Sequence, residues 1–224
     1  MVTALDQPSD RVKGLEAGAD DFLTKPVDDI ALITRVRNLA RLKMLTDEML
    51  MRASTEEQMG FAAALGVRLD QLGRGGRILL VEDRDRSAER IMGALKDERH
   101  VEWERDPSRA LLRLPDGNFD LLIVSLSLED ADGLRLCSQV RSLDRTRHLP
   151  IMIIIEPGDD SRLLRGLDMG VNDYIVRPVD TNELLARVRT QVKRKRYTDH
   201  LRTRLEETVE MAVLDPLTAL HAAT

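Results

Sequence analysis

The sequence has few aromatic residues and a single cysteine. Aromatic residues make up only 3% of the 224 residues, so a surface of rings that stacks nucleobases is not expected. One cysteine, Cys137, cannot form a disulfide or a cysteine-based zinc cluster within one chain. It falls on the apolar face of an expected helix, where a small buried side chain is more common than a catalytic thiol. These features favour a reducing, cytoplasmic compartment.

The chain also lacks an excess of positive charge and a long apolar run. It has 34 Lys and Arg residues against 39 Asp and Glu residues, a formal net charge of −5. A mildly acidic chain does not favour nucleic acid as a partner. No segment approaches the ~20 apolar residues that a membrane-spanning helix needs, and the first residues lack the pattern of a signal peptide. We therefore expect neither a nucleic-acid nor a membrane partner.

An internal repeat organises the chain. Residues 9–37 align without a gap with residues 161–189, at an offset of 152. The identical pairs include Gly14 with Gly166, Gly18 with Gly170, Asp21 with Asp173, Pro26 with Pro178, and Asp28 with Asp180. The aligned stretch is not a solenoid unit, so it indicates two copies of one domain, the first present only as its end.

Each copy has the same predicted local structure. A short helix ends at a glycine, a short apolar strand follows, and a basic residue with a proline ends that strand. Asp28 and Asp180 are the predicted N-caps of the next helix. In the second copy, the helical spacing of that helix is carried by Leu184, Leu185, Val188 and Val192.

Residues 77–194 are predicted to form five successive βα units. The expected strands are residues 77–81, 101–104, 121–124, 151–155 and 174–176. Uniformly apolar strands that alternate with helices indicate a parallel sheet covered on both faces. Such sheets place their functional sites at the carboxyl ends of the strands.

Helical segments are expected on both sides of this unit. The helix after Pro26 should continue to Leu45, and Ser54-Thr55-Glu56-Glu57 is a capping-box pattern that predicts the start of a new helix. Residues 72–76 read as a flexible linker. After Val192 the helix is expected to continue as a stalk with a coiled-coil-like spacing of leucines.

These motifs resemble the receiver domain of response regulators, which has a flavodoxin-like fold. The resemblance is carried by Glu82-Asp83, by Asp132-Gly133 and by the run Asp-Tyr-Ile-Val-Arg-Pro at 173–178. Two receivers followed by a helix that reaches Asp215-Pro216-Leu217-Thr218 are similar to PleD-type diguanylate cyclases, in which such a segment opens the catalytic GGDEF domain. After Thr218 the match fails, because Ala219 replaces the usual glycine and no GGDEF motif occurs.

The resemblance divides the chain into four expected parts. Residues 1–45 would be the C-terminal part of a first receiver, and residues 46–76 a helical connector and linker. Residues 77–195 would be a second, degenerate receiver that serves as an adaptor. Residues 196–224 would be a signalling helix that leads to the start of an absent GGDEF domain.

The resemblance also assigns the positions of the receiver site. A working receiver uses two acidic residues for Mg²⁺, an aspartate that accepts phosphate, and a hydroxyl residue and a lysine that contact the phosphoryl group. In the second copy these positions hold Glu82 and Asp83, then Ser125, Ile155 and Arg177. Serine cannot form the acyl phosphate that aspartate forms, so no phosphoacceptor is expected. A weak Mg²⁺ site at the acidic pair remains the alternative to no cofactor.

The first copy shows the reverse pattern. Thr3 and Lys25 occupy its hydroxyl and lysine positions. The strands with its acidic pair and acceptor would lie before Met1. The first copy is therefore expected to hold only a remnant of a receiver site.

The sequence thus predicts a regulatory and dimerisation scaffold of a two-component, cyclic di-GMP signalling protein, with no catalytic residues of its own. The alternative is a fragment of an active diguanylate cyclase, which converts two GTP to cyclic di-GMP, with its catalytic domain beyond residue 224. The resemblance implies a histidine kinase partner and a homodimer through the faces at 9–45 and 161–194 and the C-terminal helix. It also implies cis bonds at Lys25–Pro26 and Arg177–Pro178.

Overall fold

The structure, a computed structural model, describes residues 1–3, 13, 17, 19, 21–55, 75–96 and 100–218. Among these residues, no helix has the length and apolar character needed to cross a bilayer.

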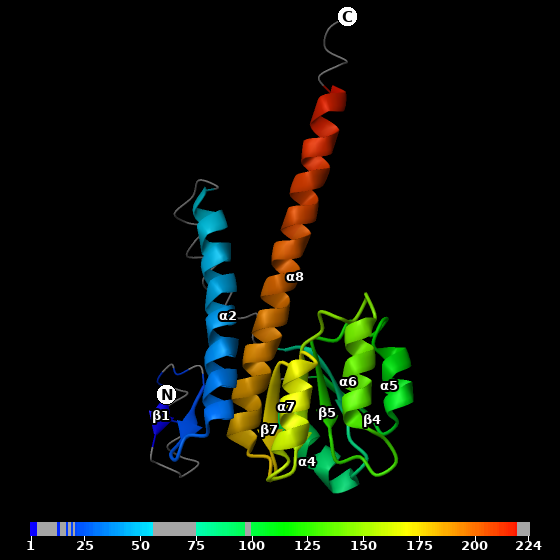
Figure 1. The fold of residues 1–224 in the computed structure, drawn as a ribbon. Coiled ribbons are helices and arrows are strands. Elements are labelled where there is room, and N and C mark those ends of the chain that lie inside the picture. The colour runs from blue at the N-terminus through cyan, green and yellow to red at the C-terminus, as the bar shows by residue number, and fades with distance from the viewer. Residues whose placement is uncertain are drawn as a thin grey trace, which may run out of the picture.

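Five parallel strands form the central sheet (Figure 1). They are β3 (Arg77–Val81), β4 (His100–Glu104), β5 (Leu121–Ser125), β6 (Ile151–Ile155) and β7 (Asp173–Val176). Their order across the sheet is β4-β3-β5-β6-β7, and every pair is parallel. All residues of β5 and β6 are buried, as expected for strands covered on both faces. The predicted five-stranded parallel sheet is confirmed.

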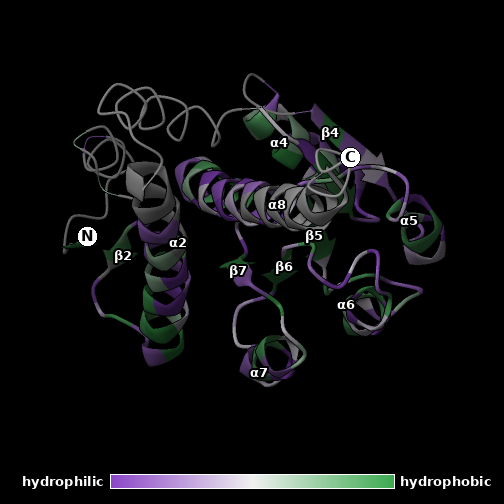
Figure 2. Ribbon diagram, turned by 90° about the horizontal axis from the view of Figure 1, so that it is seen from above, coloured by the Kyte–Doolittle hydropathy of each residue, from purple (hydrophilic) through white to green (hydrophobic). Residues whose placement is uncertain are grey.

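Helices cover both faces of this sheet (Figure 2). On one face α4 (Asp85–Leu95) and α8 (Thr181–Thr218) bury side chains against Leu80 and Ile154. On the other face lie α5 (Pro107–Arg113), α6 (Gly133–Ser142) and α7 (Asp160–Asp168). This alternation of strand and helix brings the carboxyl ends of β3, β5, β6 and β7 to one edge.

Helix α8 belongs to the receiver core at its start and leaves it afterwards. Leu184, Val188 and Val192 are fully buried against the sheet. The helix is 38 residues long, and its later turns extend past the sheet (Figure 1). The predicted continuation of this helix beyond Val192 is therefore confirmed.

The described part of the first copy contains two short strands and one helix. These are β1 (Val2–Thr3), β2 (Leu23–Thr24) and α2 (Asp29–Thr55). Val2 pairs with Leu23 and Thr3 with Thr24. In the second copy, Ile154 pairs with Ile175 and Ile155 with Val176. Both pairs are shifted by the same 152 residues, so the repeat extends to the register of the strands.

The turns into α2 and α8 are also equivalent. Asp28 Oδ1 accepts a hydrogen bond of 2.8 Å from the Ala31 backbone N–H, and Asp180 Oδ1 accepts one of 2.9 Å from the Glu183 N–H. Each bond satisfies an N–H that the first helical turn leaves free, which confirms both predicted N-caps. The Lys25–Pro26 and Arg177–Pro178 bonds are both cis, as predicted. Gly170, at φ +90°, ends α7 as expected.

The connector differs from the prediction. Ser54 and Thr55 lie in the last turn of α2, so the predicted N-cap at Ser54 is wrong. Residues 29–55 contain neither glycine nor proline, and nothing in their sequence stops the helix earlier. Glu56, Glu57 and residues 72–74 lie outside the described residues. Gly75 and Gly76 have φ of +64° and +130°, a region that favours glycine.

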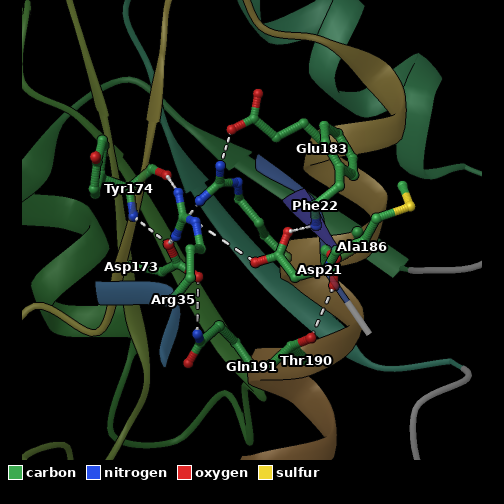
Figure 3. A network of polar contacts seen from close by, with 11 residues as sticks. Asp21, Phe22, Arg35, Asp173, Tyr174, Glu183, Ala186, Thr190 and Gln191 are labelled. Carbon is green, nitrogen blue, oxygen red and sulfur yellow. Dashed lines mark hydrogen bonds and ion pairs between the residues drawn. The ribbon is translucent and has the colours of Figure 1, made fainter. Parts of the chain in front are cut away.

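A buried ion network joins α2 to α8 and β7 (Figure 3). Arg35, only 3% exposed, forms an ion pair with Asp173 and lies 3.5 Å from Asp21. It also donates a 3.0 Å hydrogen bond to the Tyr174 carbonyl. Asp173 pairs at 3.2 Å with Arg187. Since Arg35 and Asp21 are the repeat equivalents of Arg187 and Asp173, matching faces of the two copies pack against each other.

Burial acts strongly on this network. Removal from water lowers the pKa of Arg35, and the charge of Asp21 acts in the opposite direction. Burial likewise raises the pKa of Asp21, and Arg35 opposes that shift. Buried charges of this kind are tolerated when they are paired and hydrogen-bonded. The faces at 9–45 and 161–194, which were expected to form the contact between two chains of a homodimer, contact each other within one chain.

Candidate functional site

A polar cluster lies at the carboxyl edge of the central sheet. Glu82 follows β3, Ser125 ends β5 and Arg177 follows β7. Glu82 and Ser125 are both 0% exposed. The structure brings these three predicted site residues into one hydrogen-bonded group, as expected for residues at the carboxyl edge of one parallel sheet.

Arg177 contacts four other side chains of the cluster. Its Nη2 donates to Glu82 Oε2 at 2.5 Å and to Ser125 Oγ at 3.2 Å. Its Nη1 donates to Ser87 Oγ at 2.7 Å, and its Nε lies 3.3 Å from Glu156 Oε1. The side chain is only 14% exposed. One guanidinium therefore contacts residues of β5, of α4 and of the segments that follow β3 and β6.

Both carboxylate oxygens of Glu82 are engaged. Oε1 accepts from the Arg84 backbone N–H at 3.2 Å, and Oε2 accepts from Ser87 Oγ at 2.7 Å and from Arg177. The backbone carbonyl of Glu82 accepts a 2.7 Å bond from the indole N–H of Trp103. Trp103 is the only tryptophan of the chain, so its fluorescence reports on this site.

The two remaining predicted residues, Asp83 and Ile155, form no hydrogen bond with Arg177. Asp83 Oδ2 accepts a 2.6 Å bond from the Glu129 N–H, and its Oδ1 is buried with no hydrogen-bond partner among the described residues. Ile155, 2% exposed, packs in the core between the sheet and α6 and α7. Its side chain leaves the hydroxyl position of the site without a donor.

Sequence reasoning missed three residues of the cluster. Ser87 lies in the first turn of α4, Glu156 directly follows β6, and Arg84 pairs with Glu156 at 2.9 Å. Burial acts to raise the pKa of Glu156, but hydrogen bonds from Arg84 and Ser127 and the charge of Arg177 outweigh it and lower that pKa. The carboxyl-edge rule covers Glu156 and could have found it. No comparable signal pointed to Ser87.

The cluster does not fit a resident Mg²⁺ ion. Magnesium requires near-octahedral coordination by hard oxygen ligands. Here both oxygens of Glu82 are taken by hydrogen bonds, and a cationic guanidinium touches the same carboxylate. Across the described residues, no three His, Cys, Asp or Glu side chains gather in a metal-binding arrangement. Asp83 Oδ1 is the one carboxylate oxygen of the acidic pair without a hydrogen bond.

Two other candidates receive simpler assignments. Cys137 is 0% exposed, and burial raises the pKa of its thiol to about 12, so it is a core side chain rather than a nucleophile. Thr3 ends β1 beside β2, and Lys25 follows β2 with its side chain exposed. The structure thus places these two residues at equivalent ends of neighbouring strands.

Comparisons with known proteins agree with this geometry. The response regulator receiver domain family matches residues 78–189. The response regulator PleD of Caulobacter vibrioides is 46% identical over 221 residues, which cover 99% of this chain and 48% of PleD. The response regulator ArlR of Staphylococcus saprophyticus is 38% identical over 120 residues, or 53% of each chain. The chain therefore spans about half the length of the curated relatives it matches.

A solved structure shows the same fold. A putative response regulator from Chloroflexus aurantiacus J-10-fl superposes with a TM-score of 0.51 at 31% identity. The match covers 53% of this chain and 98% of that one. In receiver terms the strand order β4-β3-β5-β6-β7 is 2-1-3-4-5, the flavodoxin-like order.

Proposed function

Because the chain belongs to the response regulator receiver family, as a partial PleD-like protein, we propose that residues 77–195 act as an adaptor receiver that does not accept phosphate. The observation that carries this proposal is the contact between Ser125 and Arg177. Ser125 stands at the acceptor position, fully buried at the end of β5. A serine hydroxyl there cannot give the acyl phosphate on which a receiver switch depends.

The surroundings of Ser125 support the same assignment. Its Oγ accepts a hydrogen bond from Arg177, whose guanidinium is committed to Glu82 and Ser87 as well. No histidine takes part in this cluster to act as a base that would activate the hydroxyl. Ile155 supplies no hydrogen bond to a phosphoryl group. The cluster therefore links the carboxyl ends of β3, β5 and β7 and has no group positioned for phosphoryl transfer.

We further propose that residues 1–45 are the C-terminal part of a first receiver. The shared strand register and the equivalent N-caps support this. The exposure of α2 supports it too. Leu32 and Val36 are 38% and 57% exposed, whereas their repeat equivalents Leu184 and Val188 are 0% exposed. Leu32 and Val36 are therefore exposed at the helix positions that the second copy buries against its central sheet.

For the whole protein we propose a cytoplasmic regulator of the PleD type. Its partner would be a histidine kinase, and residues 196–224 would be the signalling helix that leads to a GGDEF domain. The sequence contains no GGDEF motif, so we assign any diguanylate cyclase activity of the whole protein to a domain outside residues 1–224. The purified chain should therefore make no cyclic di-GMP from GTP, and turnover free of contaminating cyclase would contradict this.

A homodimer is part of the proposal. Matching faces of the two copies already pack within the chain through Arg35 and Asp173, and the same pairing can form between two chains by exchange of the first copy. Exposed apolar side chains on α2 favour such contacts, and a two-fold pair is the commonest result of self-association. Sedimentation equilibrium should give a dimer mass, whereas a monomer at high micromolar concentration would contradict the proposal.

Phosphorylation tests the adaptor assignment. The wild-type chain is incubated with acetyl phosphate and Mg²⁺ beside S125D/R177K and S125D/I155T/R177K, which restore the receiver residues stepwise. Intact mass should show no added phosphoryl group on the wild type and one on the restored variants. The site is then mapped by peptide analysis. A phosphoryl group on an aspartate of the wild-type chain would refute the proposal.

A further inference from the structure

Arg177 stands at the lysine position of the receiver site. Its guanidinium touches Glu82, Ser87, Ser125 and Glu156. The first of these is the carboxylate of the acidic pair that Mg²⁺ would use, and the third is the acceptor position. We infer that the guanidinium of Arg177 is a built-in cation that replaces the divalent metal and closes the site to it.

The charges of the cluster support this inference. Glu82 is a carboxylate with 0% exposure, and Arg177 is its ion-pair partner at 2.5 Å. A carboxylate withdrawn from water needs a compensating cation nearby. Glu156, on the other side of the guanidinium, adds a second acid at 3.3 Å. Arg177 therefore lies between two carboxylates and offsets the charge of the buried one, Glu82.

The shape of the side chain decides between arginine and lysine. Lysine, the usual receiver residue, carries a compact charge with three donors. The guanidinium is planar and presents five donors in a fixed fork. Here Nη1 donates to Ser87 and Nη2 donates to Glu82 and Ser125, while Nε lies 3.3 Å from Glu156 without a hydrogen bond. The two terminal nitrogens of the fork thus bond to an acid and two hydroxyls at once, and the guanidinium occupies the side of Glu82 that faces Ser87 and Ser125.

The contacts of Arg177 also hold the N-terminal end of α8 in place. Arg177 lies between β7 and the start of α8 at Thr181, and it bonds to groups of β5 and α4. A receiver with a mobile metal can alter these contacts when the site is loaded. Because the guanidinium is part of the chain, the inference implies that these contacts do not depend on metal loading and that the start of α8 keeps one position. The inference rests on the proposed function and adds how the adaptor state is maintained.

Manganese binding tests the inference. Free Mn²⁺ is measured by its electron paramagnetic resonance signal as it is titrated with wild type, R177Q and R84Q. Arg84 is the matched control, because it also pairs with Glu156 but its side chain does not reach Glu82. Because the repulsion between two cations a few ångströms apart is removed, R177Q should bind Mn²⁺ at least about tenfold more tightly than wild type, while R84Q should behave as wild type. Trp103 fluorescence follows the same titrations.

Stability provides a second readout. R177Q leaves Glu82 buried without a cation, so its thermal midpoint should fall, and added Mn²⁺ should restore part of the loss. The double variant E82Q/R177Q removes both charges, should fold without metal and should lose the Mn²⁺ response. The wild-type midpoint should not move with Mn²⁺.

The possible outcomes separate clearly. Wild-type binding as tight as that of R177Q would overturn the inference, and so would an equal gain in R84Q or no gain in R177Q. If R177Q does not fold, the wild-type titration and the double variant still decide. If the wild-type chain binds metal but accepts no phosphate, the inference that Arg177 replaces the metal is refuted and the adaptor assignment remains intact. Phosphate on an aspartate would refute the adaptor assignment itself.

Discussion

Replacement of Asp173 by asparagine should weaken the packing of α2 on α8 and β7. Asp173 is 1% exposed, and its carboxylate is shared by Arg35 and Arg187, which are 3% and 4% exposed. It also accepts bonds from the Tyr174 backbone N–H at 2.7 Å and from Gln191 at 3.1 Å. Asparagine keeps the shape and part of the hydrogen bonding but removes the negative charge.

The structure sets the expected size of the loss. Loss of one partner from a buried ion pair costs about 3–5 kcal/mol of unfolding free energy. Each arginine keeps one other acid, since Arg35 stays 3.5 Å from Asp21 and Arg187 stays paired with Glu183. We therefore expect the lower end of that range, about 3 kcal/mol. The repeat-equivalent change D21N should cost only about 1 kcal/mol, because Arg35 keeps Asp173.

Urea unfolding measures both changes. Far-UV circular dichroism reports on all helices, including the 27 residues of α2. Trp103 fluorescence reports on the receiver sheet through β4. If α2 separates before the receiver unfolds, the two signals of D173N will have different midpoints, whereas those of D21N will coincide. A D173N loss below about 1 kcal/mol, or a D21N loss as large as that of D173N, would refute this account of the network.

Three further predictions concern the core, pH and the thiol. L184A should cost about 2–5 kcal/mol of unfolding free energy because Leu184 is fully buried. The repeat-equivalent L32A should cost less than about 1 kcal/mol, because Leu32 is 38% exposed. Equal losses would contradict the difference in burial between the two helices. The pKa of Glu156 in the folded chain lies below its ordinary value of 4.5, so the stability that its charge contributes is present above pH 4.5 and is lost as pH falls through the folded pKa. Denaturant unfolding should therefore show that the difference in unfolding free energy between wild type and E156Q becomes smaller below pH 4.5. A difference that grows there would contradict the direction of the pKa shift. Native Cys137 should resist iodoacetamide at pH 8 and react after unfolding, since burial raises its pKa to about 12; rapid native alkylation would show an accessible thiol.

Much of the fold could be predicted from the sequence for identifiable physical reasons. The apolar strands β5 and β6 are long enough to read as buried parallel strands, and the gap-free repeat transferred the N-cap at Asp180 to Asp28. The resemblance to receivers then placed Glu82, Ser125 and Arg177 in one site at the carboxyl edge of the sheet. The same reasoning failed at Ser54, where a capping pattern inside a sequence without glycine or proline did not interrupt α2.

The contacts within the site were less accessible to sequence reasoning. The direction of the Arg177 side chain depends on the turn after β7 and on where α4 begins. Ser87 joined the cluster only because α4 presents its first turn to the edge. The packing of α2 on β7 pairs residues 138 positions apart, such as Arg35 and Asp173, and no local pattern specifies that partner.

Amide hydrogen exchange at the N-terminal end of α8 tests the central claim most directly. The claim is that this receiver is a fixed adaptor, in which Ser125 and Arg177 hold the junction of β7 and α8 in one state. Exchange rates of residues 176–190 should be the same for the wild-type chain with and without acetyl phosphate and Mg²⁺, whereas they should change in S125D/I155T/R177K. A phosphodonor-dependent change in the wild-type chain would contradict the claim.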